Sequence, residues 1–419
     1  MSNKTNTAVK EDAKPALTPK LRFPEFREEA GWTEKPLKAV AEINPANDGL
    51  PESFIYIDLE SVEAGKLKAK NRISRVGAPS RAQRLVERGD IIYQVVRPYQ
   101  RNNLLCEFDD DEDYVASTGY AQLRAKGNNR FLYQSIHTDS FVGRVIAKCT
   151  GSNYPAINSS DLAEIELSLP PSLPEQQKIA ECLSSVDELI AAQARKLDAL
   201  KGHKKGLMQQ LFPRDGETQP RLRFPEFKNA GEWELEPLRQ LASYENGKAY
   251  EQDITENGKY IVVNSRFIST NGAVRKYTNA EYLTADAGDV LMVLSDLPKG
   301  KALAKCYFVE TDDRYAVNQR VCRLKPGRID GKFLCYILNR HPHLLAFDDG
   351  LNQTHLSKGS VTECPLSVSP EKEEQQRIAD CLTSLDDLIA AQTQKLDVLK
   401  IHKKGLMQQL FPSPKEIEA

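Results

Sequence analysis

Apolar residues recur at alternating spacings of four and three in two separate stretches of the chain, 175–213 and 374–412. A narrow apolar stripe that continues for about five and a half heptads is typical of a coiled-coil helix. Each helix would be about 58 Å long at a rise of 1.5 Å per residue. The stripe consists of Ile179, Leu183, Val186, Ile190, Leu197, Leu200, Leu207 and Leu211, and of Ile378, Leu382, Leu385, Ile389, Leu396, Leu399, Leu406 and Leu410.

The two stretches are copies of each other, 199 residues apart, with 30 of 39 positions identical. Pro174 lies where a helix can start, and Pro213 and Pro412 end both copies because proline has no amide hydrogen to donate. The motif Leu-Arg-Phe-Pro-Glu-Phe also occurs twice, at 21–26 and 222–227, and one of the two tryptophans follows each occurrence. The chain therefore has a repeated frame.

We expect the two helices to pair with each other in antiparallel fashion. The connection from 213 to 222 spans at most ~29 Å, too short to return along such a helix. Antiparallel pairing would place one insert at each end of a rod, related by an approximate twofold axis. It would also bring 410–412 to 21–26, so that the chain is nearly circular. The alternative is that each helix pairs with another molecule.

The inserts within this frame, 32–170 and 233–370, hardly resemble each other in sequence but share a mixed, strand-rich pattern. A Gly-Asp turn precedes an apolar run in both, again 199 residues apart. The pattern predicts strands at 53–57, 90–96 and 260–263, and helices at 130–147 and 332–346. We therefore expect two similar folds with different surfaces.

The composition favours a soluble, cytoplasmic protein: 28% of residues are charged, mean hydropathy is −0.51, and no apolar run approaches the ~20 residues of a membrane span. Residues 1–20 are polar and are predicted to form a disordered tail, not a signal peptide. The eight cysteines form no CxxC pair and do not cluster with histidine. We expect reduced, mostly buried thiols and no metal site.

The net charge of −2 conceals a segregation of charge in the first insert. Ten basic residues lie between Lys66 and Arg101, opposed only by Glu87 and Asp90, and an acidic run follows at 107–113. One face could therefore be strongly positive, as nucleic-acid binding requires. The competing interpretation is a solvated basic surface.

Amide and guanidinium side chains can form paired hydrogen bonds with base edges in the DNA major groove. Loop-like segments of both inserts are rich in such groups, although a turn or surface role competes for each one. The candidates in the first insert are Arg72, Arg75, Arg81, Arg84, Gln94, Arg97, Tyr99, Gln100, Arg101, Asn102, Asn153 and Tyr154. Those in the second are Asn264, Arg266, Lys299, Lys301, Asn318, Gln319, Arg320, Asn352, Gln353 and His355.

Several motifs together resemble the specificity (S) subunit of type I restriction-modification systems over residues 17–412. They are the repeated Leu-Arg-Phe-Pro-Glu-Phe followed by Trp and Pro-Leu, the insert end at 165–170, the helix start Glu-Gln-Gln-x-Ile-Ala and the helix end Gly-Leu-Met-Gln-Gln-Leu-Phe-Pro. The second insert end, Cys-Pro-Leu-Ser-Val-Ser-Pro at 364–370, departs from the pattern.

The resemblance implies an α+β fold. Two mixed α/β target recognition domains would be separated by two long antiparallel coiled-coil helices, in a pseudo-twofold, circular arrangement. The expected divisions are a tail (1–20), the first recognition domain (21–172), the first helical repeat (173–213), a linker (214–220), the second recognition domain (221–370), the second helical repeat (371–412) and a tail (413–419).

The resemblance also implies a non-catalytic, DNA-binding subunit of a host-defence system. Each recognition domain would read one half of a split, asymmetric double-stranded DNA site. The helices would set the spacing and bind two methyltransferase (M) subunits, with residues 203–205 and 402–404 as candidate contacts. We expect no cofactor in this chain. S-adenosylmethionine for adenine methylation would lie in the M subunits, and ATP and Mg would serve the restriction (R) subunits.

Two other functions remain open. A stand-alone DNA-modifying enzyme would need a glycine-rich cofactor loop and an Asn-Pro-Pro-aromatic type of site. Asn44-Pro45-Ala46 is a poor substitute for that site. A coiled-coil scaffold with protein-binding inserts is the other alternative, and salt-sensitive DNA binding would argue against it.

Overall fold

The computed structural model describes residues 17–151, 153–297, 300–312 and 314–412. They form two compact units: the first runs up to Ala194 and resumes at Gln394, and the second is Arg195–Thr393. The long helices α5 (Leu173–Leu211) and α11 (Lys372–Leu410) each contribute one half to each unit. Both helices end two residues before a proline, as the sequence predicts, and Pro174 lies in the first turn of α5, where no amide donor is needed.

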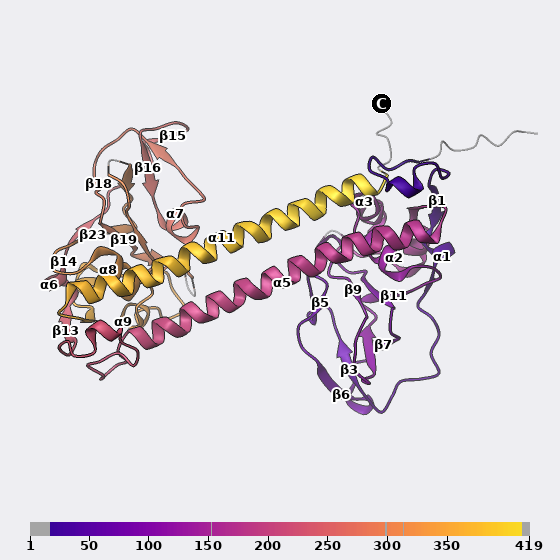
Figure 1. Ribbon diagram of the computed structural model, residues 1–419, viewed down its shortest axis with the longest axis horizontal. Helices are drawn as coiled ribbons and strands as arrows, with labels where there is room; N and C mark the ends of the chain where they lie inside the picture. The colour runs from indigo at the N-terminus through magenta and orange to yellow at the C-terminus, as the bar shows by residue number, and fades with distance from the viewer. Residues whose placement is uncertain (1–16, 152, 298–299, 313, 413–419) are drawn as a thin grey trace, which may run out of the picture. The chain divides into compact units, whose positions relative to one another are not determined.

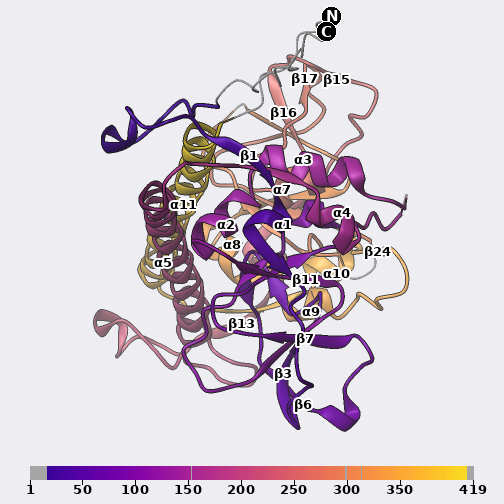
Figure 2. The same cartoon turned by 90° about the vertical axis from the view of Figure 1, so that its right-hand side faces the viewer.

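In the first unit, β1 (Thr33–Pro36) pairs antiparallel with β12 (Glu166–Leu169), which joins the two ends of the insert. A sheet of order β2-β11-β8-β9 packs against the long helices, and a second sheet, β6-β3-β10-β7, lies farther from α5 (Figures 1 and 2). The strands are β2 (Ala41–Ile43), β3 (Ser53–Ile57), β6 (Asn71–Ser74), β7 (Ala82–Val86), β8 (Ile91–Gln94), β9 (Leu104–Leu105), β10 (Tyr114–Ser117) and β11 (Tyr120–Ala125), with a hairpin of β4 (Val62–Glu63) and β5 (Lys66–Leu67).

Short helices complete the first unit: η1 (Pro24–Phe26), α1 (Leu37–Val40), η2 (Arg75–Gly77), η3 (Pro98–Gln100), α2 (Asn129–Ser135), α3 (Asp139–Lys148) and α4 (Ser159–Ala163). The single helix expected at 130–147 is two helices. The Thr138 side chain accepts the Phe141 amide hydrogen and thereby caps a new helix start. Helix α2 packs on α5, where Gln134 donates to Asp187 at 2.9 Å.

The second unit repeats this plan. Strands β13 (Glu234–Pro237) and β25 (Pro365–Val368) join the insert ends, so the divergent second end forms the same kind of strand pair as the first. The sheets have the orders β14-β23-β19-β21 and β15-β17-β16-β22-β18. Their strands are β14 (Ala242–Asn246), β15 (Ile254–Thr255), β16 (Tyr260–Val263), β17 (Tyr277–Thr278), β18 (Thr284–Ala285), β19 (Val290–Val293), β21 (Cys306–Phe308), β22 (Tyr315–Val317) and β23 (Val321–Pro326).

The remaining elements of the second unit are a two-stranded ladder, β20 (Ser295–Asp296) with β24 (Thr354–His355), and short helices. The helices are η4 (Pro225–Phe227), α6 (Leu238–Leu241), α7 (Ser265–Ser269), α8 (Gly331–Leu338), α9 (Pro342–Leu345) and α10 (Lys358–Thr362). The helix expected at 332–346 is also split, because α8 ends at Leu338 and Arg340 takes a left-handed backbone conformation (φ 59°) before α9 begins.

Within each unit the two helix halves run antiparallel and lie side by side (Figure 1). In the first unit, Lys403 near the end of α11 pairs with Asp187 near the start of α5 at 2.7 Å. In the second, Lys204 of α5 donates to Asp386 of α11 at 2.6 Å. The antiparallel expectation is therefore confirmed, and these two lysines, expected to contact partner subunits, are engaged in ion pairs between the helices.

The residues of the apolar stripe are buried or half-buried along both helices. Leu183 and Leu410 belong to the core of the first unit, and Leu211 and Leu382 to the core of the second. Each insert thus shares a hydrophobic core with the helix halves beside it.

The Leu-Arg-Phe-Pro-Glu-Phe motif clamps the start of one helix to the end of the other. In the first unit, Arg22 donates from Nε and Nη2 to Glu175 of α5, both at 2.8 Å. The Leu21 amide hydrogen donates to the Gln409 carbonyl of α11 at 2.9 Å. The repeated motif at 21–26 therefore meets the end of α11, as the circular arrangement predicts.

The second unit contains an equivalent clamp with one difference. Arg223 pairs with Glu374 at 2.7 Å, and the Leu222 amide hydrogen donates to the Gln210 carbonyl at 2.9 Å. In the first unit, the Trp32 indole also donates to the clamp carboxylate, at 3.2 Å. Ser369 takes that place in the second unit, at 2.5 Å.

Two predictions from the sequence are corrected. The expected tail, residues 1–20, is too long, because Leu17 and Trp32 exchange two backbone hydrogen bonds and Pro19 is buried. Residues 1–16 and 413–419 lie outside the described part. All eight cysteines are free, but only Cys106, Cys322 and Cys364 are buried and the other five are half-buried, so most are not buried as expected. No described helix is long and apolar enough to cross a membrane.

Candidate nucleic-acid interface

Three segments far apart in the sequence meet at one edge of the first unit. The Val95 amide hydrogen donates to the Gly119 carbonyl at 3.1 Å, and Ile157 donates to the Val95 carbonyl at 3.0 Å. We call residues 94–103, 117–119 and 153–157 the first loop cluster. It brings together the predicted reading residues of the 94–102 segment and the Gly-x-Asn segment.

The second unit forms the same cluster from its own residues. Leu294 donates to the Arg320 carbonyl at 2.9 Å, and Leu356 donates to the Leu294 carbonyl at 2.8 Å. We call residues 294–297, 300–303, 318–320 and 352–356 the second loop cluster. The register is equivalent as well: Val96 opposite Ala156 in the first cluster corresponds to Ser295 opposite His355 in the second, 199 residues later at both positions.

Several predicted base readers of the first cluster instead hold its loop in place. Gln94 is buried; its Nε2 donates to Gln100 at 2.9 Å and its Oε1 accepts the Asn102 amide hydrogen at 3.2 Å. Arg101 donates to the His137 carbonyl at 3.0 Å and to Asp139 at 2.7 Å. Gln94 and Arg101 therefore have partners within the protein.

Other members of the first cluster face solvent. The Tyr99 side chain is 50% exposed, Tyr154 is 65% exposed, and Asn153 is exposed. The Arg97 guanidinium lies 4.3 Å from the centre of the Tyr154 ring, a cation–π contact between two parts of the cluster. An exposed ring beside a cation is suited to contact a base or a sugar-phosphate backbone.

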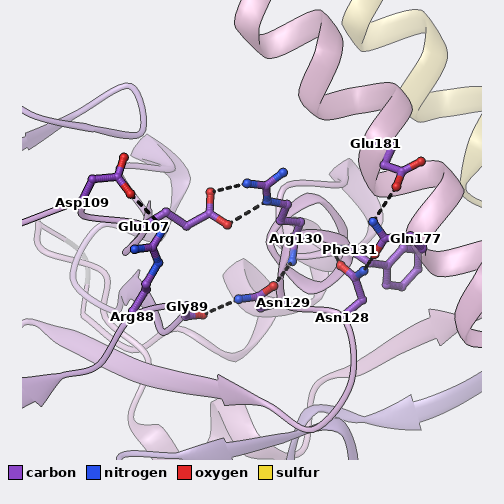
Figure 3. A network of polar contacts seen from close by, with 10 residues as sticks. All are labelled: Arg88, Gly89, Glu107, Asp109, Asn128, Asn129, Arg130, Phe131, Gln177 and Glu181. Atoms are coloured by element: carbon purple, nitrogen blue, oxygen red, sulfur yellow. Dashed lines mark hydrogen bonds and ion pairs between the residues drawn. The ribbon is translucent and has the colours of Figure 1, made fainter.

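The positive face of the first insert is smaller than the sequence predicts, because the acidic run folds onto the basic stretch. Arg88 pairs with Asp109 at 2.8 Å and Arg130 forks onto Glu107 at 2.7 and 3.0 Å (Figure 3). The same figure shows Arg130 at the start of α2, the helix that packs on α5. Opposite charges that are separate in sequence therefore neutralise each other in the fold.

Strand order explains two further pairs. The acidic run leads into β10, and β10 lies two strands from β6 in the order β6-β3-β10. Lys70 accordingly pairs with Asp110, and Arg72 pairs with Glu112. Arg72 therefore has an internal partner that its position in the basic stretch did not reveal.

The other arginines of the stretch differ in environment. Arg75 donates to the Leu50 carbonyl at 3.1 Å, and Arg81 is exposed beside the first cluster, where its carbonyl accepts the Thr118 amide hydrogen. Arg84 is half-buried in β7, and its Nε has no hydrogen-bond partner among the described residues. Burial lowers the pKa of Arg84.

In the second unit, several predicted residues also have partners within the protein. Asn318 and Gln319 both donate to Glu251 at 3.1 Å, Gln353 donates to Ser295 at 2.9 Å, and Asn264 caps α7. Arg266, Lys301, Arg320, Asn352 and His355 are exposed, as are Gln319 and Gln353, and Asn352 also bonds to Asp349 at 3.2 Å. Lys299 lies outside the described residues.

Sequence reasoning missed residues that the fold places in the second cluster. Glu251 holds the 318–319 turn, and Asp296 accepts the amide hydrogens of Leu297 and Ala302 at 2.9 and 2.7 Å. The signal that could have found Asp296 is the 199-residue offset, which pairs it with Arg97. The described residues contain no group of three or more His, Cys, Asp or Glu side chains that could hold a metal ion.

Solved structures resemble this fold. The type I restriction-modification S subunit from M. genitalium aligns over 95% of this chain and 100% of its own, with a TM-score of 0.61 and 17% identity. A chain from a study of complex assembly and conformational transition of the type I restriction-modification system aligns over 91% and 98%, with a TM-score of 0.53 and 20% identity. At these identities the likeness concerns the fold alone.

Sequence comparison identifies the family. The MjaVIII specificity subunit of a type I restriction enzyme from Methanocaldococcus jannaschii is 26% identical over 276 residues, which are 62% of this chain and 64% of that relative, less than two thirds of its length. Residues 70–202 and 230–400 match the type I restriction modification DNA specificity domain, and they make up more than half of the chain. The chain therefore belongs to the family of type I restriction-modification DNA specificity domains.

Proposed function

We propose that this chain is the sequence-specific DNA-binding subunit of a type I restriction-modification complex in the cytoplasm. Each recognition domain reads one half of an asymmetric, bipartite double-stranded site. The observation that carries this proposal is the pair of loop clusters. Their backbones share one register while their side chains differ, Arg97 and Tyr154 in one and Asp296 and Gln353 in the other.

Different side chains on one scaffold favour two different half-sites. Base edges are distinguished by the hydrogen-bond groups they present in the major groove, so a changed set of reading groups selects another sequence. Backbone contacts alone would add affinity without distinguishing sequences. The recognition step therefore belongs to the inserts, and the repeated helices serve assembly.

The chemistry of modification and cleavage belongs to partner subunits in this proposal. Two M subunits supply S-adenosylmethionine and methylate adenine, and R subunits supply the steps that need ATP and Mg. The chain acts as a non-catalytic scaffold that brings these subunits to the site. The family assignment supports this division of labour.

The test is to assemble the purified chain with its M subunits and to map the adenines that the complex methylates. We expect methylation at one bipartite motif. Replacing residues 32–170 by the corresponding insert of a relative should change one half of the motif and leave the other half unchanged. Methylation at no defined site, or an unchanged motif after the exchange, would contradict the proposal.

The main alternative is a coiled-coil scaffold whose inserts bind proteins. The exposed cations Arg81, Arg266 and Arg320 favour DNA, because phosphate contacts make binding steeply dependent on salt. Binding of the assembled complex to duplex DNA should therefore weaken strongly between 50 and 200 mM salt, roughly 10³-fold or more for six or more phosphate contacts. A complex that binds no DNA at either salt concentration would favour the scaffold.

A further inference from the structure

The side chain of one arginine of the first loop cluster has a nitrogen without a hydrogen-bond partner among the described residues. Arg97 is half-buried, and its Nε is buried without a partner among the described residues. Its one contact of note is the Tyr154 ring, 4.3 Å from the guanidinium carbon. By contrast, both terminal nitrogens of Arg101, four residues later, donate hydrogen bonds, one to the His137 carbonyl and one to Asp139. A guanidinium N–H that is buried without an acceptor costs free energy unless a ligand supplies one.

The backbone at Arg97 has a strained conformation that surrounding contacts hold in place. Arg97 and Arg101 both adopt the left-handed conformation with φ 55°, on either side of η3. Such conformations persist in non-glycine residues only where surrounding contacts impose them. Here the contacts are the Gln94 bonds to Gln100 and Asn102, and the Arg97 amide hydrogen donating to the Pro155 carbonyl at 2.7 Å.

The equivalent position of the second loop cluster has the opposite chemistry. Asp296 lies 199 residues after Arg97, and Gln353 lies 199 residues after Tyr154. Asp296 is occupied by loop amide hydrogens, and Gln353 donates to Ser295. The first unit therefore has the Arg97 guanidinium stacked on an aromatic ring at this position. The second unit has the Asp296 carboxylate, which is hydrogen-bonded to its own loop.

A guanidinium fork matches the O6 and N7 acceptors of guanine in the major groove, and this is the commonest specific arginine contact to a base. A ring beneath the guanidinium restricts its orientation, which lowers the entropy lost when the fork binds. Resting on the proposed DNA-reading function, we propose that Arg97, held on Tyr154, reads a guanine in the half-site of the first recognition domain. The second domain has no equivalent reader at position 296 and recognises its half-site by other groups.

The experiment uses the full chain assembled with its M subunits and a pool of random-sequence DNA duplexes at fixed salt. Bound duplexes are recovered and sequenced for the parent chain and for R97Q, R97K, Y154A and Y154F. We expect the parent to select a bipartite motif. R97Q should lose its preference for one guanine in one half-site by about 5- to 150-fold, the range for one bidentate base contact, while the other half-site keeps its sequence.

The other variants separate the contribution of the guanidinium fork from those of the positive charge and of the Tyr154 ring. R97K keeps the charge but lacks the planar fork, so it should lose most of the same preference. Y154A should weaken preference at the same base pair, whereas Y154F keeps the ring and should keep the motif. The matched control is R88Q, which removes an exposed arginine of the same basic stretch that is paired with Asp109, and should leave the motif unchanged.

The outcomes distinguish this inference from the function on which it rests. If the parent selects no motif, the proposed function fails and the inference fails with it. If the parent selects a motif and R97Q retains every preference, or binds all sequences equally more weakly, only the inference is overturned. Far-ultraviolet circular dichroism and thermal melting of each variant verify that the fold is kept. A loss at one guanine with an unchanged melting temperature supports the inference.

Discussion

Replacing Glu175 by glutamine tests whether the buried clamp holds the first unit together. The Glu175 and Arg22 side chains are 1% and 6% exposed, and the carboxylate accepts two hydrogen bonds from Arg22 and one from Trp32. Glutamine keeps the size of the side chain but leaves the guanidinium charge buried without its counter-charge. Removing one partner of a buried ion pair costs about 3–5 kcal/mol in the free energy of unfolding.

The lower end of this range applies here, because Arg22 keeps two carbonyl acceptors. These are Glu29 at 2.8 Å and Ala30 at 3.0 Å. We therefore expect E175Q to destabilise the first unit by about 3 kcal/mol. With a urea slope of about 2 kcal/mol/M, the midpoint of unfolding should fall by roughly 1.5 M.

The two tryptophans allow each unit to be followed separately, since Trp32 lies in the first unit and Trp233 in the second. In a W233F background the fluorescence of Trp32 reports the first unit during urea unfolding. The control is E25Q, which removes the exposed partner of Lys178 and should hardly move the midpoint. If E175Q shifts the Trp32 midpoint no more than E25Q does, the clamp does not stabilise the unit and the reasoning is refuted.

Three further predictions concern His137, two glycines and the closure of the chain. Burial lowers the pKa of His137 to about 4, and its Nε2 faces the Asn103 amide at 3.2 Å. The folded state thus favours neutral His137, so the first unit should lose stability as pH falls from 6.5 towards 4, and H137Q should lessen that loss in urea midpoints at pH 7 and 5. A Cβ on Gly247 would lie 2.0 Å from a backbone oxygen, so G247A should lower the Trp233 midpoint. A Cβ on Gly202, in a helix, meets nothing within 4 Å, so G202A should raise the free energy of unfolding of the second unit by up to ~1 kcal/mol and raise the Trp233 midpoint accordingly. A permuted chain opened within 213–221, with its old ends joined, should keep both fluorescence transitions; loss of either would contradict the meeting of the chain ends.

Periodicity and repetition were sufficient to predict the frame. A stripe of apolar residues every three or four positions has only one face to bury, so the helices and their antiparallel pairing could be inferred from residues such as Leu183 and Leu382. The Gly-Asp turns before β8 and β19 likewise marked strands in both units. These signals are local, or depend on the length of one short connection.

The reading residues could not be sorted in the same way. The sequence offers three equally suitable side chains in this loop, Gln94, Arg97 and Arg101. In the structure, Gln94 hydrogen-bonds within the loop, Arg97 stacks on a tyrosine and Arg101 pairs with a carboxylate. The two arginines are distinguished by contacts with residues 36 and 57 positions away, which no local pattern records. The prediction of a strongly positive face overestimated the free positive charge for the same reason, because strand order brings the acidic run back beside the basic stretch.

By itself, then, the sequence determined a duplicated helical frame, two mixed α/β inserts and the family to which the chain belongs. The spacing of apolar residues predicts a helix without tertiary information, because a helix repeats its own geometry at every turn. Sequence identity between the two copies likewise reveals the repeat directly. Only the tertiary structure decided which polar groups remain available to a ligand. A hydrogen-bonding side chain is free or occupied according to its neighbours in space, and in each unit of this protein segments that are distant in the sequence supply some of those neighbours.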